Sequence, residues 1–182
     1  MRYNVDASRV RELMRRLGHA ARSSGRVYLT GGATAVLKGW RQETIDIDIR
    51  FEPDLPELFA AIPELKKELA MNVELASPQD FIPALPDWRA RSELITTHGL
   101  LAFFHYDFYA QVLAKIERGH AQDVTDVKAF FREGLVVAEK LLELFSRIEP
   151  DLVRYPALDP AIFRSKVERA VAGARELGRD DP

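Results

Sequence analysis

The chain has 182 residues, of which 47% are apolar and 30% charged, with a formal net charge of −2 and no cysteine. A length of this order suits one domain, or one domain with a helical extension. The missing cysteines exclude disulfides and thiolate chemistry, and the small net charge gives no global attraction to nucleic acid. No apolar run approaches a membrane span of about 20 residues, and the N-terminus lacks the apolar core of a signal peptide. We therefore expect a cytoplasmic protein with no membrane partner.

The N-terminal segment predicts an amphipathic helix over residues 7–22, with Asp6 as its N-cap. Seven arginines fall within the first 26 residues, against the two acids Asp6 and Glu12. Two interpretations stay open for this basic face. It is either solvated, or it contacts an RNA backbone or a triphosphate, which requires the face to line a cleft.

Short apolar runs predict a sheet in the first part of the chain. The strands that we expect lie over residues 26–30, 44–51, 72–76, 93–97 and 100–106. A short helix is expected over residues 33–38, and a second helical region that ends near Met71 should break at Pro63. Residues 77–88 contain three prolines and predict an ordered loop. The last two strands should turn at His98–Gly99.

The pattern becomes helical after Asp107. The helices that we expect lie over residues 108–118, 122–132, 135–148 and 160–177. The fold class is therefore α/β (α+β), a mixed sheet flanked by helices and followed by a C-terminal helical extension. We place the domains at residues 1–135 and 136–182.

The strand over residues 44–51 carries two acids at alternating positions. Because side chains at i and i+2 share a face, Ile45, Ile47 and Ile49 should point one way and Asp46 and Asp48 the other. Two ionised carboxylates side by side repel by about 1 kcal/mol or more. A divalent cation would offset this cost, and Mg²⁺ prefers such oxygens together with substrate phosphates. The alternative is an exposed edge strand with solvated acids.

A glycine pair, Gly31–Gly32, precedes Asp46, the first of these acids, by fourteen to fifteen residues. Glycine allows a backbone to approach a phosphate closely, and the following helix offers free N–H groups. Phosphates beside a carboxylate-held metal indicate phosphoryl or nucleotidyl transfer.

The order strand, Gly-Gly, short helix, strand with Asp-x-Asp resembles the nucleotidyltransferase fold in its minimal bacterial form. It is most similar to the AbiEii-related and other toxin–antitoxin-type nucleotidyltransferases. The resemblance spans about residues 26–135, and it continues through Ser77–Pro83 and through Lys115–His120 with Asp123 and Asp126.

This resemblance implies a set of site residues. Those implied for the nucleotide are Gly31, Gly32, Thr34, Lys115 and Arg118. Those implied for Mg²⁺ or Mn²⁺ are Asp46, Asp48 and Glu74, and the catalytic set is Asp46, Asp48, Glu74, Lys115, Asp123 and Asp126.

Four of these assignments, those of Glu74, Lys115, Asp123 and Asp126, have alternatives. Asp80 and Asp107 are alternatives to Glu74 as the third carboxylate. Without a catalytic role, Glu74 would be an acid at the rim of the site, Asp80 would form a hydrogen bond within its loop, and Asp107 would be an N-cap. Lys115 lies among apolar neighbours, so it either snorkels to water or reaches the triphosphate.

Asp123 and Asp126 share a helix face. The alternative role for Asp123 is that of a helix cap. The alternative role for Asp126 is an ion pair with Arg118 or Arg132. The four histidines have no metal-ligand spacing and are expected to be structural.

The resemblance implies an enzyme that moves a nucleoside monophosphate from an NTP to a hydroxyl of RNA (tRNA) or protein, within a toxin–antitoxin system. Its partners would be the NTP, the acceptor and a cognate toxin or antitoxin. The alternative is a catalytically degenerate member that acts as an antitoxin-like binding partner.

Overall fold

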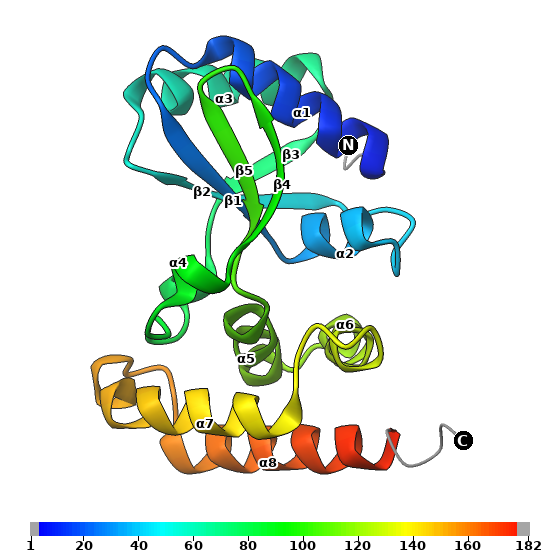
Figure 1. Ribbon diagram of the computed structural model, residues 1–182, viewed down its shortest axis with the longest axis vertical. Coiled ribbons are helices and arrows are strands. Elements are labelled where there is room, and N and C mark those ends of the chain that lie inside the picture. Colours follow the sequence, from blue (N-terminus) through cyan, green and yellow to red (C-terminus); the bar gives the residue numbers. More distant parts are fainter. Residues whose placement is uncertain (1–3, 178–182) are drawn as a thin grey trace. The chain divides into compact units, whose positions relative to one another are not determined.

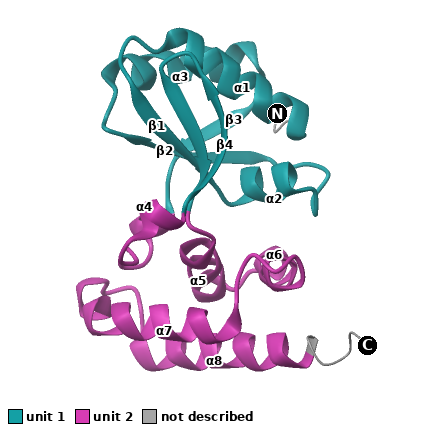
Figure 2. Cartoon of the chain, in the orientation of Figure 1, with its two compact units in different colours: residues 1–77, 92–106 teal, residues 78–91, 107–182 magenta. Residues whose placement is uncertain are grey.

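The computed structural model describes residues 4–177, which form two compact units (Figures 1 and 2). Unit 1 comprises Met1–Ser77 and Ser92–Tyr106, and unit 2 comprises Pro78–Arg91 and Asp107–Pro182. The chain therefore passes from unit 1 to unit 2, returns, and crosses again. The boundary expected between residues 135 and 136 lies inside unit 2.

Unit 1 is built on a five-stranded mixed sheet with the strand order β3-β2-β1-β5-β4. Its strands are β1 (Gly25–Thr30), β2 (Asp46–Glu52), β3 (Asn72–Leu75), β4 (Glu93–His98) and β5 (Leu101–His105). The pairs β1–β2 and β4–β5 are antiparallel, whereas β1–β5 and β2–β3 are parallel. The mixed α/β class expected from the sequence is confirmed.

One face of this sheet forms the core of unit 1. In β2 the buried positions alternate with half-buried ones, so Ile47, Ile49 and Phe51 point into the core. The helices α1 (Ala7–Ala20) and α3 (Pro56–Glu68) pack their apolar faces in the same cluster. A third helix, α2 (Gly32–Lys38), follows the glycine pair and packs on β1 and β2.

The N-cap predicted for α1 is confirmed, because the Asp6 carboxylate accepts a hydrogen bond from the backbone N–H of Arg9 at 2.9 Å. Two arginines of α1, which lie beside its apolar stripe, contact the end of α3. Arg9 donates to the carbonyl oxygens of Leu69 and Ala70, and Arg16 forms an ion pair with Glu68. These arginines contribute to packing within unit 1.

The expected break at Pro63 is wrong, since α3 runs through this residue. A proline inside a helix removes one N–H and leaves the carbonyl four residues earlier, here that of Phe59, without its intrahelical partner. The buried side chains Leu58, Ile62 and Leu65 hold the helix on the core.

One further expectation for unit 1 needs correction. Ile45 precedes β2 and is exposed, so only Ile47 and Ile49 of the three isoleucines share the core face. In β3, Val73 is buried, whereas Leu75 at the end of the strand is exposed.

Unit 2 is helical. Its elements are η1 (Pro78–Asp80), α4 (Trp88–Arg91), α5 (Phe108–Arg118), α6 (Ala121–Arg132), α7 (Ala138–Ile148), η2 (Glu149–Arg154) and α8 (Pro160–Leu177). The four long helices lie near their predicted positions, whereas the turns η1 and α4 were not predicted within the proline-rich segment. Because α8 packs against α5, α6 and α7, the predicted C-terminal extension is part of the same helical unit.

Across the described part of the chain, every helix is too short or too polar to cross a membrane.

Candidate functional site

The acids of β2 lie on the sheet face opposite the core. Asp46 and Asp48 are half-buried and alternate with the buried Ile47 and Ile49, as the period of the strand predicted. Their Cα atoms are therefore separated by two strand residues, roughly 7 Å. Both carboxylates therefore lie on the same side of the sheet.

The carboxylate of Asp48 lies directly beside the glycine turn. Asp48 pairs with Thr30 in the antiparallel register of β1 and β2, and Thr30 is the residue before Gly31. A Cβ atom built on Gly31 would lie 2.9 Å from the Asp48 Oδ2 atom. Gly31 also has φ 61° and ψ −126°, a backbone conformation that L side chains rarely adopt. The turn needs glycine for both reasons.

Gly32 is needed for a separate reason, the close approach of Thr44. A Cβ atom on Gly32 would lie 2.0 Å from the Thr44 Oγ1 atom, which itself donates a hydrogen bond to the Asp46 carbonyl at 3.2 Å. The segment before β2 therefore packs on the glycine turn, and the two halves of the Gly-Gly and Asp-x-Asp pattern are in contact.

Glu74 and Asn72 extend the acidic face to the neighbouring strand. In the parallel register of β2 and β3, Asp46 pairs with Asn72 and Asp48 with Glu74. The Asn72 amide donates 2.8 Å hydrogen bonds to Asp46 Oδ1 and to Glu74 Oε1. Asn72 thus ties a predicted metal ligand to the predicted third carboxylate.

The acidic face of Asp46, Asp48 and Glu74 can be compared with the ligands that a divalent cation needs. Among residues 4–177, no three His, Cys, Asp or Glu side chains lie close enough to hold a metal, so the predicted set of Asp46, Asp48 and Glu74 is not a preassembled three-ligand site. Mg²⁺ commonly uses one or two carboxylates and takes its remaining oxygens from substrate phosphates and water. The pair Asp46 and Asp48 fits that requirement.

Thr34 lies in the first turn of α2, with its side chain inside unit 1. Its hydroxyl is fully buried, 3.1 Å from the His105 Nδ1 atom and 3.4 Å from the Leu29 carbonyl oxygen. Burial, together with the positive charge of Lys38, lowers the pKa of His105 from 6.5 to about 4, against an opposing effect of Glu93. A neutral His105 therefore holds the helix that follows the glycine turn.

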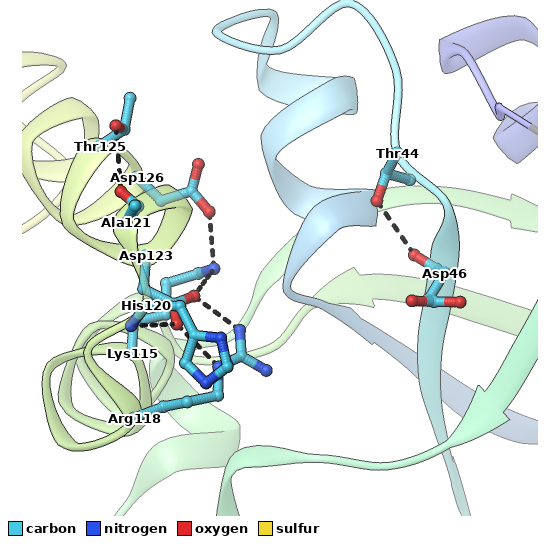
Figure 3. A network of polar contacts seen from close by, with 9 residues as sticks. All are labelled: Thr44, Asp46, Lys115, Arg118, His120, Ala121, Asp123, Thr125 and Asp126. Atoms are coloured by element: carbon cyan, nitrogen blue, oxygen red, sulfur yellow. Dashed lines mark hydrogen bonds and ion pairs between the residues drawn. The ribbon is translucent and has the colours of Figure 1, made fainter.

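In unit 2, Lys115 forms the centre of a buried ion-pair cluster (Figure 3). Its Nζ atom lies 2.6 Å from Asp126 Oδ2 and 3.2 Å from Asp123 Oδ1, and Lys115 is only 5% exposed. Of the two alternatives for Lys115, snorkelling to water is wrong, because Lys115 is buried and two carboxylates compensate its charge. Asp126 forms its ion pair with Lys115, whereas Arg118, one of the two arginines expected to pair with Asp126, forms an ion pair with Asp123.

Arg118 completes the cluster by donating two hydrogen bonds to the Asp123 carboxylate, at 2.6 and 2.7 Å. Burial alone would raise the pKa of Asp123, but the Arg118 hydrogen bonds and the charge of Lys115 bring it down from 3.8 to about 2. Asp123 also accepts from the His120 backbone N–H at 3.3 Å, so it caps α6 and joins the cluster at once.

Asp80 and Asp107, the two alternatives to Glu74 as the third carboxylate, lie in unit 2. Asp107 is the N-cap of α5, where it accepts from the Tyr109 N–H, and it forms a 2.6 Å ion pair with Arg91. Its ordinary role as a cap is confirmed. Asp80 ends the η1 turn and is exposed.

Two residues near the acidic face were missed in the sequence. Asn72 had a usable signal, since it alternates with Glu74 and so shares its face on a strand. Thr44 had none, because its contact with Gly32 depends on how the loop before β2 folds back.

The fold and the site define a class: a mixed sheet in which a glycine turn and an Asp-x-Asp strand meet on the face opposite the core. A family model described as a nucleotidyltransferase of unknown function (DUF6036) matches residues 8–158. The chain belongs to this nucleotidyltransferase family. Comparison with curated proteins and with solved structures gave no match.

Proposed function

We propose that this protein is a metal-dependent nucleotidyltransferase, which moves a nucleoside monophosphate from an NTP to a hydroxyl of RNA or protein. The observation that carries the proposal is the position of the Asp48 carboxylate against Gly31, with Asp46 on the same sheet face. Membership of the nucleotidyltransferase family supports the reaction class.

The glycine turn would bind phosphate through its backbone. The first N–H groups of a helix have no intrahelical partners, and α2 begins at Gly32. These N–H groups would donate to phosphate oxygens at the start of α2, while Asp48 and Thr44 fill the space beside the two glycines. The buried Thr34 and His105 pair would keep α2 in place.

Asp46 and Asp48 would hold Mg²⁺ or Mn²⁺, which supplies charge stabilisation for the phosphates and the attacking oxygen when bound. In the reaction, the acceptor oxygen forms a bond to the α-phosphorus of the NTP, and the bond from that phosphorus to the leaving pyrophosphate breaks. The hydroxyl proton passes to a carboxylate. Glu74 is our candidate because it is exposed and paired in register with Asp48.

The buried pairing of Lys115 favours a second candidate function. A lysine held by two carboxylates has its charge compensated within unit 2, whereas the predicted role required it to contact the triphosphate. A member of the family that keeps the fold without transfer activity would act as a binding partner, such as an antitoxin, and would not bind NTP.

The test is label transfer. The protein is incubated with Mg²⁺, each of the four α-³²P-labelled NTPs in turn, and a cell extract, and the label is followed into RNA and into protein. We expect one NTP to label one class of acceptor, and Asp46→Asn and Asp48→Asn to abolish the labelling.

Asp54→Asn is the matched control, because Asp54 is an exposed acid of the segment after β2. It should leave labelling unchanged. Absence of labelling with all four NTPs, together with no NTP binding by the intact protein, would favour the binding-partner function instead.

A further inference from the structure

Unit 2 contains a groove that the proposed transfer reaction does not use. It has a volume of about 720 Å³ and is lined by residues of α5, α6 and α8. Figure 2 shows these three helices within unit 2. A volume of this size lies within the range of about 300–1,000 Å³ that is typical of small-molecule sites.

The walls of the groove are mainly apolar. α6 contributes Val124, Val127 and Phe131, and α8 contributes the small residues Ala170, Gly173 and Ala174. Val124 is 49% exposed although it is a large aliphatic residue. A Cβ atom built on Gly173 meets no atom within 4 Å, so the α8 wall faces open space at this position. An apolar ligand body would find contacts on both walls.

The groove is also lined by more cations than acids. Lys128, Lys166 and Arg169 line it together with one acid, Glu176, while the charge of Lys115 is compensated by Asp123 and Asp126. Lys166 lies 3.8 Å from Glu117 Oε1 and is partly neutralised.

Lys128 and Arg169 have no carboxylate partner within the part of the chain that the structure describes. Arg169 donates only to the Ser165 carbonyl oxygen there, at 3.4 Å. Two cations beside an apolar wall complement an anion that is attached to an apolar body.

We propose that this groove binds a small amphipathic anion, with a carboxylate or phosphate near Lys128 and Arg169 and an apolar body against Val124, Val127 and Phe131. The shared chemistry has two sources: an acyl chain with a terminal carboxylate, or an aromatic base with a phosphate. The site is built from residues of unit 2, uses no residue of the acidic face, and does not rest on the transfer activity.

The test uses the anionic dye 1-anilinonaphthalene-8-sulfonate as probe, with the full chain and a fluorescence titration. We expect saturable binding at one site. The double variant Lys128→Glu/Arg169→Glu should weaken it at least about tenfold, because each lost attraction is replaced by repulsion. The matched control is Arg147→Glu/Arg154→Glu, which changes the net charge by the same amount at exposed positions of α7 and η2 outside the groove. This variant should bind the dye with the affinity of the unmodified protein.

Gly173→Leu tests the apolar part of the site independently. The new side chain fills open space, and leucine favours a helix over glycine by roughly 0.8 kcal/mol, so the fold should be kept or stabilised while dye binding falls. Unchanged binding in both groove variants, or loss of binding in Asp48→Asn, would overturn the proposal.

Competition identifies the source of the ligand. Displacement of the dye by dodecanoate but not by adenosine monophosphate assigns an acyl carboxylate, and the reverse result assigns a nucleoside phosphate. Displacement by neither would overturn the proposed ligand class. Dodecanol and adenosine, which lack the charge, should displace the dye poorly.

Discussion

At the scale of single residues, the account rests on the contact between Gly31 and Asp48. Sequence reasoning placed both residues in the site, because a glycine pair and alternating acids have distinct local patterns. It did not give their proximity, which depends on the register that pairs Asp48 with Thr30. The sequence carries no local signal for the register between two strands that are separated by a helix and a loop.

Gly31→Ala should destabilise the protein by about 1–3 kcal/mol, because alanine disfavours this backbone conformation and its Cβ atom crowds Asp48. The control is Gly134→Ala, which also has a positive φ, of 66°, but open space around the new Cβ atom. Urea unfolding of both variants measures the difference. Equal costs in the two variants would show that the approach of Asp48 is not tight.

His105 makes stability depend on pH. The unfolded histidine binds a proton near pH 6.5, whereas the folded one binds it only near pH 4, so the unfolded state holds more protons between these values. Stability should be fully present above about pH 6.5 and fall by about 3 kcal/mol as the pH drops to 4.

Denaturant unfolding between pH 8 and pH 4 measures this slope, and His105→Asn should flatten it in the window from pH 6.5 to pH 4. A slope that persists unchanged in the variant would assign the effect to other groups.

At the scale of elements, most helices and strands could be predicted, because their apolar periods are regular and Asp6, Gly119 and Gly134 mark helix ends. The break at Pro63 was mistaken, since packing of α3 on the core outweighs one lost hydrogen bond. The α5–α6 pair shows the limit of such reasoning. The resemblance in sequence placed Lys115, Asp123 and Asp126 in one catalytic set, but it did not predict that they neutralise each other.

Lys115→Met should destabilise the protein by about 3–5 kcal/mol, because it removes the ammonium group that pairs with two buried carboxylates, of which Asp123 keeps its ion pair with Arg118. The double variant Lys115→Met/Asp126→Asn should recover part of this loss. Thermal or urea unfolding measures both, with Lys140→Met as control, since Lys140 pairs with Glu143 at the surface. If Lys115→Met cost no more than Lys140→Met, the cluster would not be a stabilising element.

At the scale of the whole molecule, the chain forms two units that local patterns did not delimit. Residues 78–91 belong to the helical unit although they interrupt the strands of unit 1, because the η1 turn packs against α5. Sequence showed the change to a helical period after Asp107 and placed a boundary at residue 135. Only contacts between distant segments show that α8 completes the packing of α5 and α6.

A chain truncated after residue 135 should therefore lose order in α5 and α6, since it lacks the buried Phe163, Val167 and Val171 of α8. Hydrogen exchange of the α5 amides measures this, and we expect their protection to fall by orders of magnitude while β1 and β5 keep theirs. Val153→Ser in the full chain is the control, because Val153 is 78% exposed. Full protection of the α5 amides in the truncated chain would contradict the conclusion that α5 and α8 belong to one unit.

The central claim is that Asp46 and Asp48 bind an NTP together with Mg²⁺ beside the glycine turn. The most direct measurement is a calorimetric titration of the protein with each NTP, in the presence of Mg²⁺ and in its absence. The account predicts binding that requires Mg²⁺ and that Asp48→Asn removes while Asp54→Asn keeps it. Binding of equal strength without Mg²⁺, or in Asp48→Asn, would contradict it.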